Sequence, residues 1–232
     1  MSDERASGGV ALFGGTFDPP HIGHLTVAQD AFDALPVQRV VWIPCGCPPH
    51  KRPWRLSSPE LRLEMTRAAV ADDERFRVSD REVRRKGRSY TVDTLRARAA
   101  VDRAPRLFLL IGPDQAAAFR SWREPDEIAR LARVVVMVPG GGSFGRVPSP
   151  GVEHEQLPVT RIDVSSSGIR TRFGEGRRLR YVVPDPVRAI VEREGLYRHT
   201  DRTYIAAGGV ASGGGGAGRR HAMTRGTRWT KR

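Results

Sequence analysis

Short runs of apolar, β-branched residues recur along this chain, and segments with the composition of helices lie between them. Continuous apolar runs of this kind are typical of strands that are buried in a parallel sheet. We expect strands at residues 10–13, 39–43, 76–78, 106–111 and 134–138, and helices at residues 25–34, 59–71, 91–100, 125–131 and 186–194. The alternation predicts an α/β fold, a Rossmann-like, doubly wound parallel sheet with its ligands at the carboxyl ends of the strands.

Composition divides the chain into three parts. Residues 1–9 are small and polar and are expected to be flexible, residues 10–198 carry the apolar runs, and residues 199–232 are Gly/Arg-rich without apolar periodicity. Such a tail is typical of disorder. The length of 232 residues suits a single α/β domain with a tail. Because we find neither a run of about 18 apolar residues nor a secretory leader, we expect a cytoplasmic protein.

The chain is strongly basic, with a formal net charge of +13 and a sequence pI near 11.0. Residues 199–232 hold seven Lys or Arg against one Asp, which leaves 32 basic and 25 acidic residues in the rest. A positive excess suits a protein that binds nucleic acid, and it equally suits an enzyme that binds triphosphates. Charge alone therefore leaves both classes open.

The two cysteines, Cys45 and Cys47, are separated by one residue. That gap is too tight for an easy disulfide, and two thiols are too few ligands for a structural zinc site. A metal half-site completed by His50 is the alternative, and we favour the interpretation of both as loop thiols.

Residues 14–24, directly after the first apolar run, read GGTFDPPHIGH. The glycines allow the backbone to approach an anion closely, and the prolines delay the following helix until about Pro20. His21 and His24 then share one face of the first helical turn, where unpaired N–H groups and the helix dipole favour negative charge. A tight turn before an ordinary helix would not explain the whole combination. The segment therefore predicts a phosphate-binding site.

Residues 164–170, VSSSGIR, form a second segment suited to phosphate. Small hydroxyl residues at a helix start offer side-chain and backbone donors, and Arg170 lies three residues after Ser167, so its guanidinium can bind an outer phosphate. A plain serine cap is the simpler interpretation of the serines taken alone. Their pairing with GGTFDPPHIGH favours the phosphate site.

GGTFDPPHIGH resembles the (T/H)xGH signature of the nucleotidyltransferase superfamily, and it also contains HIGH, as class I aminoacyl-tRNA synthetases do. VSSSGIR resembles the ISSTxIR motif of the nucleotidyltransferases, with Val164 in place of Ile and Ser167 in place of Thr. The chain has no KMSKS-like lysine-rich loop and is too short for most synthetases with their anticodon-binding parts. The resemblance therefore favours nucleotidyl transfer.

Three further segments resemble bacterial nicotinate mononucleotide adenylyltransferases in order and spacing: PCGCPPHK at 44–51, SYTVDTL at 89–95, and the stretch from Gly-Pro-Asp to Ser-Trp at 112–122. The resemblance runs from about residue 10 to residue 198, where the ending GLYR also matches. It implies transfer of the adenylyl group of ATP to nicotinate mononucleotide, with release of pyrophosphate and formation of nicotinate adenine dinucleotide (deamido-NAD) for NAD biosynthesis. Pro113 departs from the small residue expected there and removes one backbone donor.

The resemblance also implies a role for each matching residue. The expected catalytic residues are His21, His24 and Arg170. The expected ATP ligands are Gly14, Gly15, Thr16, Phe17, Lys51, Asp114, Ser166 and Ser167. The acceptor ring is expected to bind Trp122 through an aromatic face, and Tyr90 and Thr91 through backbone amides at a helix start. Mg²⁺ is expected to arrive with ATP, because no carboxylate cluster suggests a dedicated metal site.

Other interpretations stay open at this point. Without the family, a loop lysine, a core tryptophan and a helix cap are the simpler interpretations of Lys51, Trp122 and Tyr90. Nicotinamide mononucleotide or phosphopantetheine could be the acceptor, since an acid and an amide are distinguished by only a few loop donors. From a different class, the basic tail could make the chain a nucleic-acid-binding protein.

Overall fold

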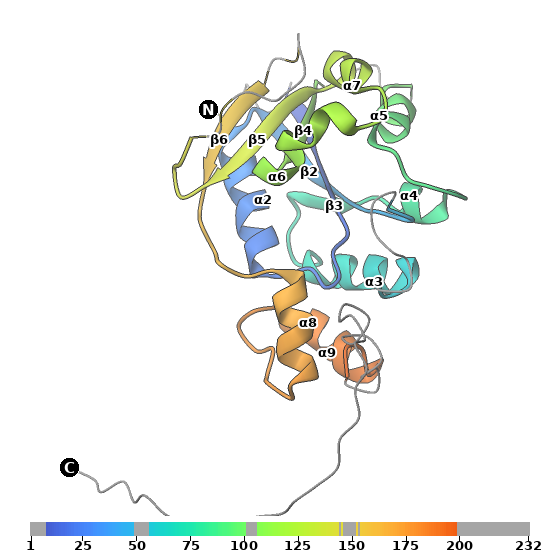
Figure 1. The fold of residues 1–232 in the computed structure, drawn as a ribbon, viewed down its shortest axis with the longest axis vertical. Helices are drawn as coiled ribbons and strands as arrows, with labels where there is room; N and C mark the ends of the chain where they lie inside the picture. Colours follow the sequence, from blue (N-terminus) through green and yellow to red (C-terminus); the bar gives the residue numbers. More distant parts are fainter. Residues whose placement is uncertain are drawn as a thin grey trace, which may run out of the picture. The chain divides into compact units, whose positions relative to one another are not determined.

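Six parallel strands form one sheet in the order β3-β2-β1-β4-β5-β6 (Figure 1). The computed structural model describes residues 8–48, 56–100, 106–143, 145, 152 and 154–198. The order reverses between β1 and β4, and ligands of such sheets bind outside the carboxyl ends of the strands at this switch point. The strands are β1 (Gly9–Gly15), β2 (Val37–Pro44), β3 (Phe76–Val78), β4 (Leu107–Ile111), β5 (Arg133–Pro139) and β6 (His154–Val159).

Helices cover both faces of the sheet, because successive strand residues point to opposite sides. Phe13 of β1 belongs to the hydrophobic cluster under α2 (Ile22–Ala34), whereas Leu12 belongs to the cluster under α5 (Thr91–Ala99). The prediction of a doubly wound sheet is confirmed. The remaining helices are α3 (Pro59–Ala69), α4 (Arg81–Arg84), α6 (Pro113–Ala117), the 3-10 helix η2 (Phe119–Ser121), α7 (Pro125–Leu131), α8 (Ser166–Gly174) and α9 (Asp185–Arg193).

α8 and α9 lie on the side of the domain where α3 lies (Figure 1), and a third hydrophobic cluster joins the three helices. Val187, Ile190 and Val191 form the buried stripe of α9, and they pack with Met65 of α3 and Ile169 of α8. This packing fixes α8 at the edge of the domain where the loop after β1 also lies.

The ten elements predicted as strands or helices are all present, and their ends agree with the prediction to within three residues. α8 starts at the serine segment as expected, whereas β6, α4, α6 and η2 were not predicted. Most of residues 1–9 and all of 199–232 lie outside the described residues, so the domain boundary at 198 stays a prediction. None of the helices in the described ranges has the length and apolar character needed to cross a membrane.

Candidate active site

Two cavities meet at the end of β1. The first, of about 1030 Å³, is lined by the loop after β1, the start of α8 and the preceding residues 160–164. The second, of about 640 Å³, lies on the opposite face of the sheet, between the loop after β2, the start of α5 and the residues around Trp122. The lining residues common to both are Gly14, Gly15, Thr16, Asp114 and Gln115.

Gly14 and Gly15 lie where these cavities meet, and a side chain would have a different effect at each of the two positions. A β-carbon at Gly15 would come within 2.6 Å of the Phe17 ring, so a side chain there would require this buried ring to move. A β-carbon at Gly14 would meet no protein atom within 4 Å. Because Gly14 lines both cavities, a side chain there would instead occupy the space in which the cavities meet.

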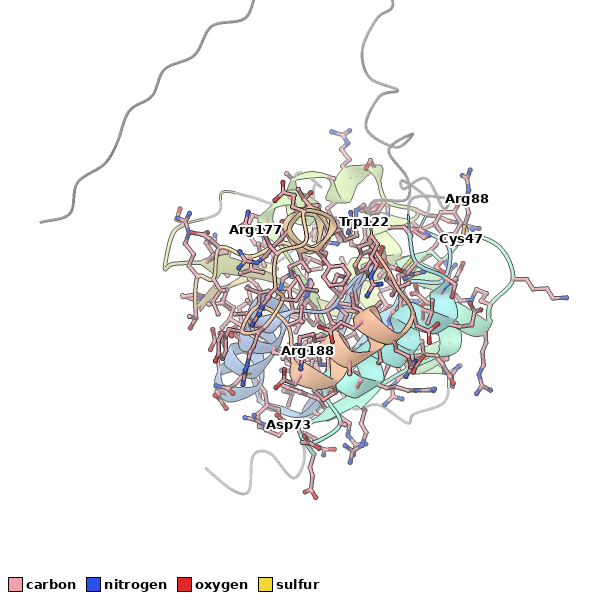
Figure 2. All side chains as sticks on the ribbon, turned by 90° about the horizontal axis from the view of Figure 1, so that it is seen from below. Cys47, Asp73, Arg88, Trp122, Arg177 and Arg188 are labelled. Atoms are coloured by element: carbon pink, nitrogen blue, oxygen red, sulfur yellow. The ribbon has the colours of Figure 1, made fainter. Side chains whose placement is uncertain are left out.

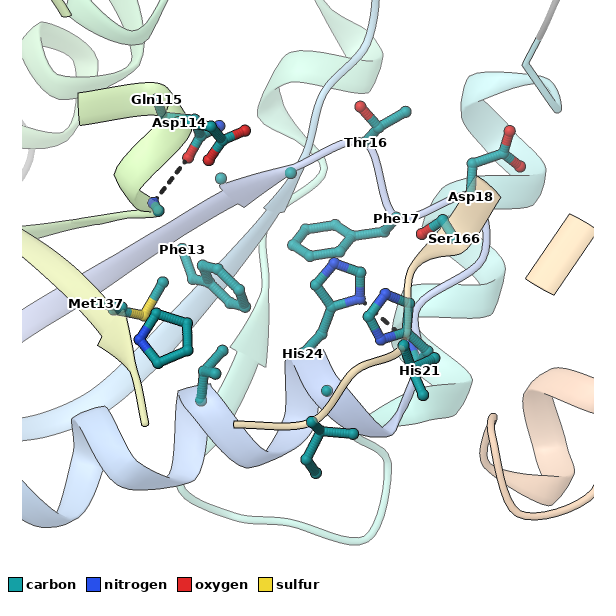
Figure 3. Close-up of a pocket in the computed structure, with 18 of the residues that line it drawn as sticks. Phe13, Thr16, Phe17, Asp18, His21, His24, Asp114, Gln115, Met137 and Ser166 are labelled. Atoms are coloured by element: carbon teal, nitrogen blue, oxygen red, sulfur yellow. Dashed lines mark hydrogen bonds between the residues drawn. The ribbon is translucent and has the colours of Figure 1, made fainter. Parts of the chain in front are cut away.

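His21 and His24 stack at the start of α2, with ring centroids 3.7 Å apart (Figure 3). His21 is the N-cap, in extended conformation, so it precedes the helical turn that both were expected to share. Its backbone N–H donates to Nδ1 of His24 over 3.3 Å, which leaves Nε2 to carry the proton of a neutral His24 ring. The Phe17 ring packs edge-on against His24 at 5.1 Å, and all three residues line the first cavity.

Burial controls the charge of His21. The residue is only 5% exposed, and the loss of water around its charged form lowers its pKa to about 4. Its Nδ1 is buried and has no hydrogen-bond partner among the described residues. Buried polar atoms are normally hydrogen-bonded in native proteins. The His21 ring therefore lines the first cavity in its neutral form, while its Nδ1 is enclosed by the protein.

Two side chains of α8 bind the backbone of the loop after β1. Ser166 Oγ donates to the carbonyl of Pro19 over 2.9 Å, and Arg170 Nη1 donates to the carbonyl of Asp18 over 2.8 Å. Both side chains line the first cavity with the histidine pair. The structure thus brings together the two motifs that the sequence analysis paired.

Ser167 is exposed and, unlike Ser166, is not one of the residues that line the first cavity. Its Oγ lies 3.3 Å from Oγ of Ser165. Ser165 is the N-cap of α8, and its Oγ accepts from the backbone N–H of Gly168 over 3.1 Å. The simpler interpretation of the serines, a helix cap, therefore holds for Ser165.

A buried arginine that the sequence analysis did not identify connects the loops around both cavities. Arg62 of α3 is 1% exposed, and it shares the inner face of that helix with Met65, which is fully buried. The sequence signal that could have identified Arg62 is a charged residue among the apolar positions of the inner face of a helix. The guanidinium donates to four backbone carbonyls, those of Thr16, Cys45, Gly46 and Ser57.

Asp18 ties the loop after β1 to the end of the described chain. Its Oδ1 accepts from the Tyr197 hydroxyl over 2.6 Å, and its Oδ2 accepts from the backbone N–H of Ser57 over 3.2 Å. Burial, followed by the nearby Asp18 carboxylate, raises the pKa of Tyr197, so the hydroxyl stays a donor. Both carboxylate oxygens of Asp18 are thus engaged within the protein.

The second cavity contains the residues predicted to bind the acceptor. Tyr90 is the N-cap of α5, Thr91 is its first helical residue, and Trp122 directly follows η2. All three line this cavity. The Trp122 ring packs on Phe119 with a centroid separation of 5.3 Å, so Trp122 combines partial core packing with a face toward the cavity.

The loop after β2 borders the same cavity. The backbone N–H of Ser89 donates to the carbonyl of Cys47 over 3.0 Å, and Figure 2 shows Cys47 next to Arg88. Cys45 lies deeper, where burial raises the pKa of its thiol to about 12. Burial also raises the pKa of Glu82, which neighbours Cys45. Both cysteines are free, and a protonated Cys45 fits the interpretation as a loop thiol.

The first cavity extends beyond the histidines to a part for which the sequence predicted no role. Its walls there are Met137 and Pro139 of β5 and residues 160–164. Asp114, in the first turn of α6, is exposed and lines both cavities. Lys51 lies outside the described residues. Across the described part of the chain, no three His, Cys, Asp or Glu side chains form a group that could hold a metal ion.

Comparisons with known proteins show the family of the chain. Residues 12–172 match the model of the cytidylyltransferase-like family. The probable nicotinate-nucleotide adenylyltransferase of Shouchella clausii is 39% identical over 188 residues, covering 81% of this chain and 96% of that protein. The protein of the same description from Thermus thermophilus is 41% identical over 189 residues, covering 82% of this chain and 99% of that protein.

A solved structure shares the fold. The nicotinic acid mononucleotide adenylyltransferase of Plasmodium falciparum, complexed with NaAD, aligns with a TM-score of 0.69 at 15% identity, covering 82% of this chain and 97% of that one. A likeness at 15% identity shows a shared fold. The family model and the bacterial relatives match the amino-acid sequence, so they show the family. This chain belongs to the cytidylyltransferase-like family and, within it, to the nicotinate-nucleotide adenylyltransferases.

Proposed function

We propose that this protein transfers the adenylyl group of ATP to nicotinate mononucleotide. An oxygen of the acceptor's 5′-phosphate forms a bond to the α-phosphorus of ATP, and the bond from that phosphorus to the oxygen bridging to the β-phosphate breaks. The products are nicotinate adenine dinucleotide and pyrophosphate. The bacterial relatives are described as enzymes of this activity, and the solved structure of the same fold is complexed with NaAD.

The observation that carries this proposal is the meeting of the two cavities at Gly14, Gly15 and Thr16. In-line phosphoryl chemistry needs the attacking and leaving oxygens on opposite sides of one phosphorus. A nucleotide in each cavity, with the α-phosphate at the glycines, would satisfy that geometry. The open space beside Gly14 allows the reacting groups to approach the backbone.

Catalysis in this scheme comes from positioning and charge stabilisation, because a phosphate nucleophile is already ionised near neutral pH and needs no base. We assign His21 and His24 to the α- and β-phosphates, with Nε2–H of His24 as one donor. Arg170 would bind the outer phosphates, and so would Ser166 through its backbone N–H in the first turn of α8, because its hydroxyl proton is donated to Pro19. Ser167 and Lys51 are assigned as further donors to the triphosphate. The histidine pair, Arg170 and Ser166 support this assignment because they line one cavity together.

The remaining roles follow from the two cavities. We assign the adenosine part of ATP to the extension between β5 and residues 160–164, with Asp114 as the ligand of ribose hydroxyls. The nicotinate ring would lie against Trp122, and the backbone amides of Tyr90 and Thr91 would bind its carboxylate.

Mg²⁺ would enter as part of the MgATP substrate. The carboxylate of Asp18, although it lines the first cavity, is engaged by Tyr197 and Ser57, so it does not offer a resident metal site. The triphosphate oxygens themselves are the hard ligands that Mg²⁺ prefers. We place the reaction in the cytoplasm, where ATP is abundant.

The substrate assignment is tested by measuring pyrophosphate release from ATP with nicotinate mononucleotide, nicotinamide mononucleotide, phosphopantetheine and glycerol 3-phosphate in turn. We expect the highest kcat/KM with nicotinate mononucleotide. Release with phosphopantetheine alone would contradict the acceptor and leave the adenylyl chemistry intact.

The histidine assignment is tested with His24→Ala. We expect turnover to fall about 100-fold or more, because a donor aimed at developing charge is lost, while the fold is retained. Gln29→Ala, on the exposed part of the same helix, is the matched control and should keep wild-type turnover. A folded His24→Ala enzyme with normal turnover would contradict the assignment.

A further inference from the structure

An arginine stands at the second cavity beside the residues assigned to the acceptor ring. Arg123 follows Trp122 directly, and both line this cavity with Tyr90. The guanidinium carbon of Arg123 lies 4.9 Å from the centroid of the Tyr90 ring, a contact of cation–π geometry. Tyr90 thus holds a planar cation next to the flat surface of Trp122.

The charges around Arg123 leave part of its positive charge uncompensated. Arg123 Nε is 3.4 Å from Glu124 Oε1, but both oxygens of Glu124 also accept hydrogen bonds from the guanidinium of Arg96. Glu127 pairs with Arg96 as well, and it accepts two hydrogen bonds from Arg130. Arg96, Arg123 and Arg130 therefore share the carboxylates of Glu124 and Glu127, with Asp93 as a further negative group near Arg96.

Two carboxyl groups line the cavity with Arg123: Asp114, which lies in the part that is shared with the first cavity, and Glu82. Glu82 is 8% exposed, its Oε1 accepts from the Thr94 hydroxyl over 2.7 Å, and burial raises its pKa. Raising the pKa of a carboxyl group favours its neutral form. The positive charge of Arg123 beside Trp122 is therefore little reduced by Glu82.

We propose that Arg123 is a specificity-determining residue, which makes the second cavity favour an acceptor whose pyridine ring carries a carboxylate over one that carries a carboxamide. This inference rests on the function proposed above. With the ring against Trp122, the guanidinium offers two parallel N–H groups to a carboxylate, and charge-assisted pairs of this kind are stronger than hydrogen bonds to a neutral amide. The backbone amides of α5 can bind a carboxylate or a carboxamide, so the preference for the carboxylate comes from the Arg123 cation.

The expected effect is moderate, because the Arg123 side chain is 53% exposed and its charge is partly screened. We expect Arg123→Met to reduce the ratio of kcat/KM for nicotinate mononucleotide over nicotinamide mononucleotide about tenfold. The change should lie in KM for the acid, with kcat/KM for the amide nearly unchanged. Arg123→Lys should keep an intermediate ratio, and Arg123→Glu should reduce the ratio below that of Arg123→Met.

Arg120→Met is the matched control, since Arg120 is exposed on the adjacent η2 and is not one of the residues lining the cavity. It should keep the wild-type ratio. In addition, roughly 0.5 M KCl should reduce the ratio of the wild-type enzyme more than that of Arg123→Met, since salt screens the charge at the rim.

An equal loss with both acceptors would overturn the proposal, because Arg123 would then only support Tyr90. An unchanged ratio in Arg123→Met and Arg123→Glu would overturn it as well. If the wild-type enzyme released pyrophosphate with neither pyridine nucleotide, both the proposed function and this inference would fail. If the wild-type enzyme is active and the Arg123 substitutions leave the ratio of kcat/KM for the two acceptors unchanged, the inference fails and the proposed function stands.

Discussion

The fold keeps the His21 side chain uncharged at neutral pH, and this has a consequence for stability. Its pKa is lowered to about 4 by burial, against 6.5 for an ordinary histidine. As pH falls from 7, the unfolded chain binds a proton at this residue that the folded chain rejects. Stability is therefore lost between about pH 6.5 and pH 4, and the full contribution is on the order of 3 kcal/mol.

We predict that the free energy of unfolding falls more steeply from pH 7 to pH 5 in the wild-type protein than in His21→Gln, which has no group to titrate there. Urea unfolding at several pH values measures both slopes. Thr26→Val, a non-titrating change in the same helix, should keep the wild-type slope. Parallel curves for wild type and His21→Gln would show that burial of His21 does not control this pH dependence.

The candidate site was predictable where its chemistry is local in sequence. The glycines, His21, His24 and the serine segment lie within short motifs, so their spacing alone indicates that they act together. Asp18 and Tyr197 are 179 positions apart, and their contact depends on the packing of α9 against α3. Neither residue type indicates a partner by itself, which is why sequence analysis could not pair them.

At the level of elements, α3 stabilises the site through Arg62. We predict that Arg62→Lys reduces the free energy of unfolding by about 3 kcal/mol, because an ammonium group cannot reach the four carbonyls that the guanidinium serves. Turnover should fall as well, since the bond to the Thr16 carbonyl fixes the loop after β1. Urea unfolding and steady-state kinetics measure the two effects.

Arg67→Lys provides the control on the same helix. The side chain of Arg67 is 55% exposed and pairs with Asp80, and exposed pairs contribute less than about 1 kcal/mol. If Arg62→Lys destabilised the protein no more than Arg67→Lys, the four carbonyl contacts would have no special role.

The strand and helices that were not predicted have a weak hydrophobic pattern, and this weakness has a physical reason. β6 is an edge strand, so only Leu157 and Val159 face the core, and Pro158 between them is tolerated because an edge strand can lack a donor. α4 and α6 span four and five residues, which is too short for a helical period to show. Buried central strands, by contrast, are readable from apolar runs alone.

At the scale of the whole molecule, the site depends on the far end of the described chain. Tyr197 lies 179 positions after Asp18, yet its hydroxyl is one of two donors to that buried carboxylate. The predicted domain boundary at residue 198 falls directly after this contact. A folded core that ended even a few residues earlier would leave Asp18 short of a donor beside the loop after β1.

Two truncations therefore separate the tail from the domain. We predict that a chain ending at Arg198 keeps the wild-type Tm and rate of pyrophosphate release, because it retains every described contact of Tyr197. A chain ending at Glu194 should lose several degrees in Tm and much of its turnover, since a buried carboxylate loses its tyrosine donor. Tyr197→Phe in the full chain should reproduce part of that loss, about 2 kcal/mol in the free energy of unfolding, without altering chain length. Loss of activity in the chain ending at Arg198 would show that the domain extends into the tail. Equal Tm and turnover in the two truncated chains would show that the Asp18–Tyr197 contact does not stabilise the site.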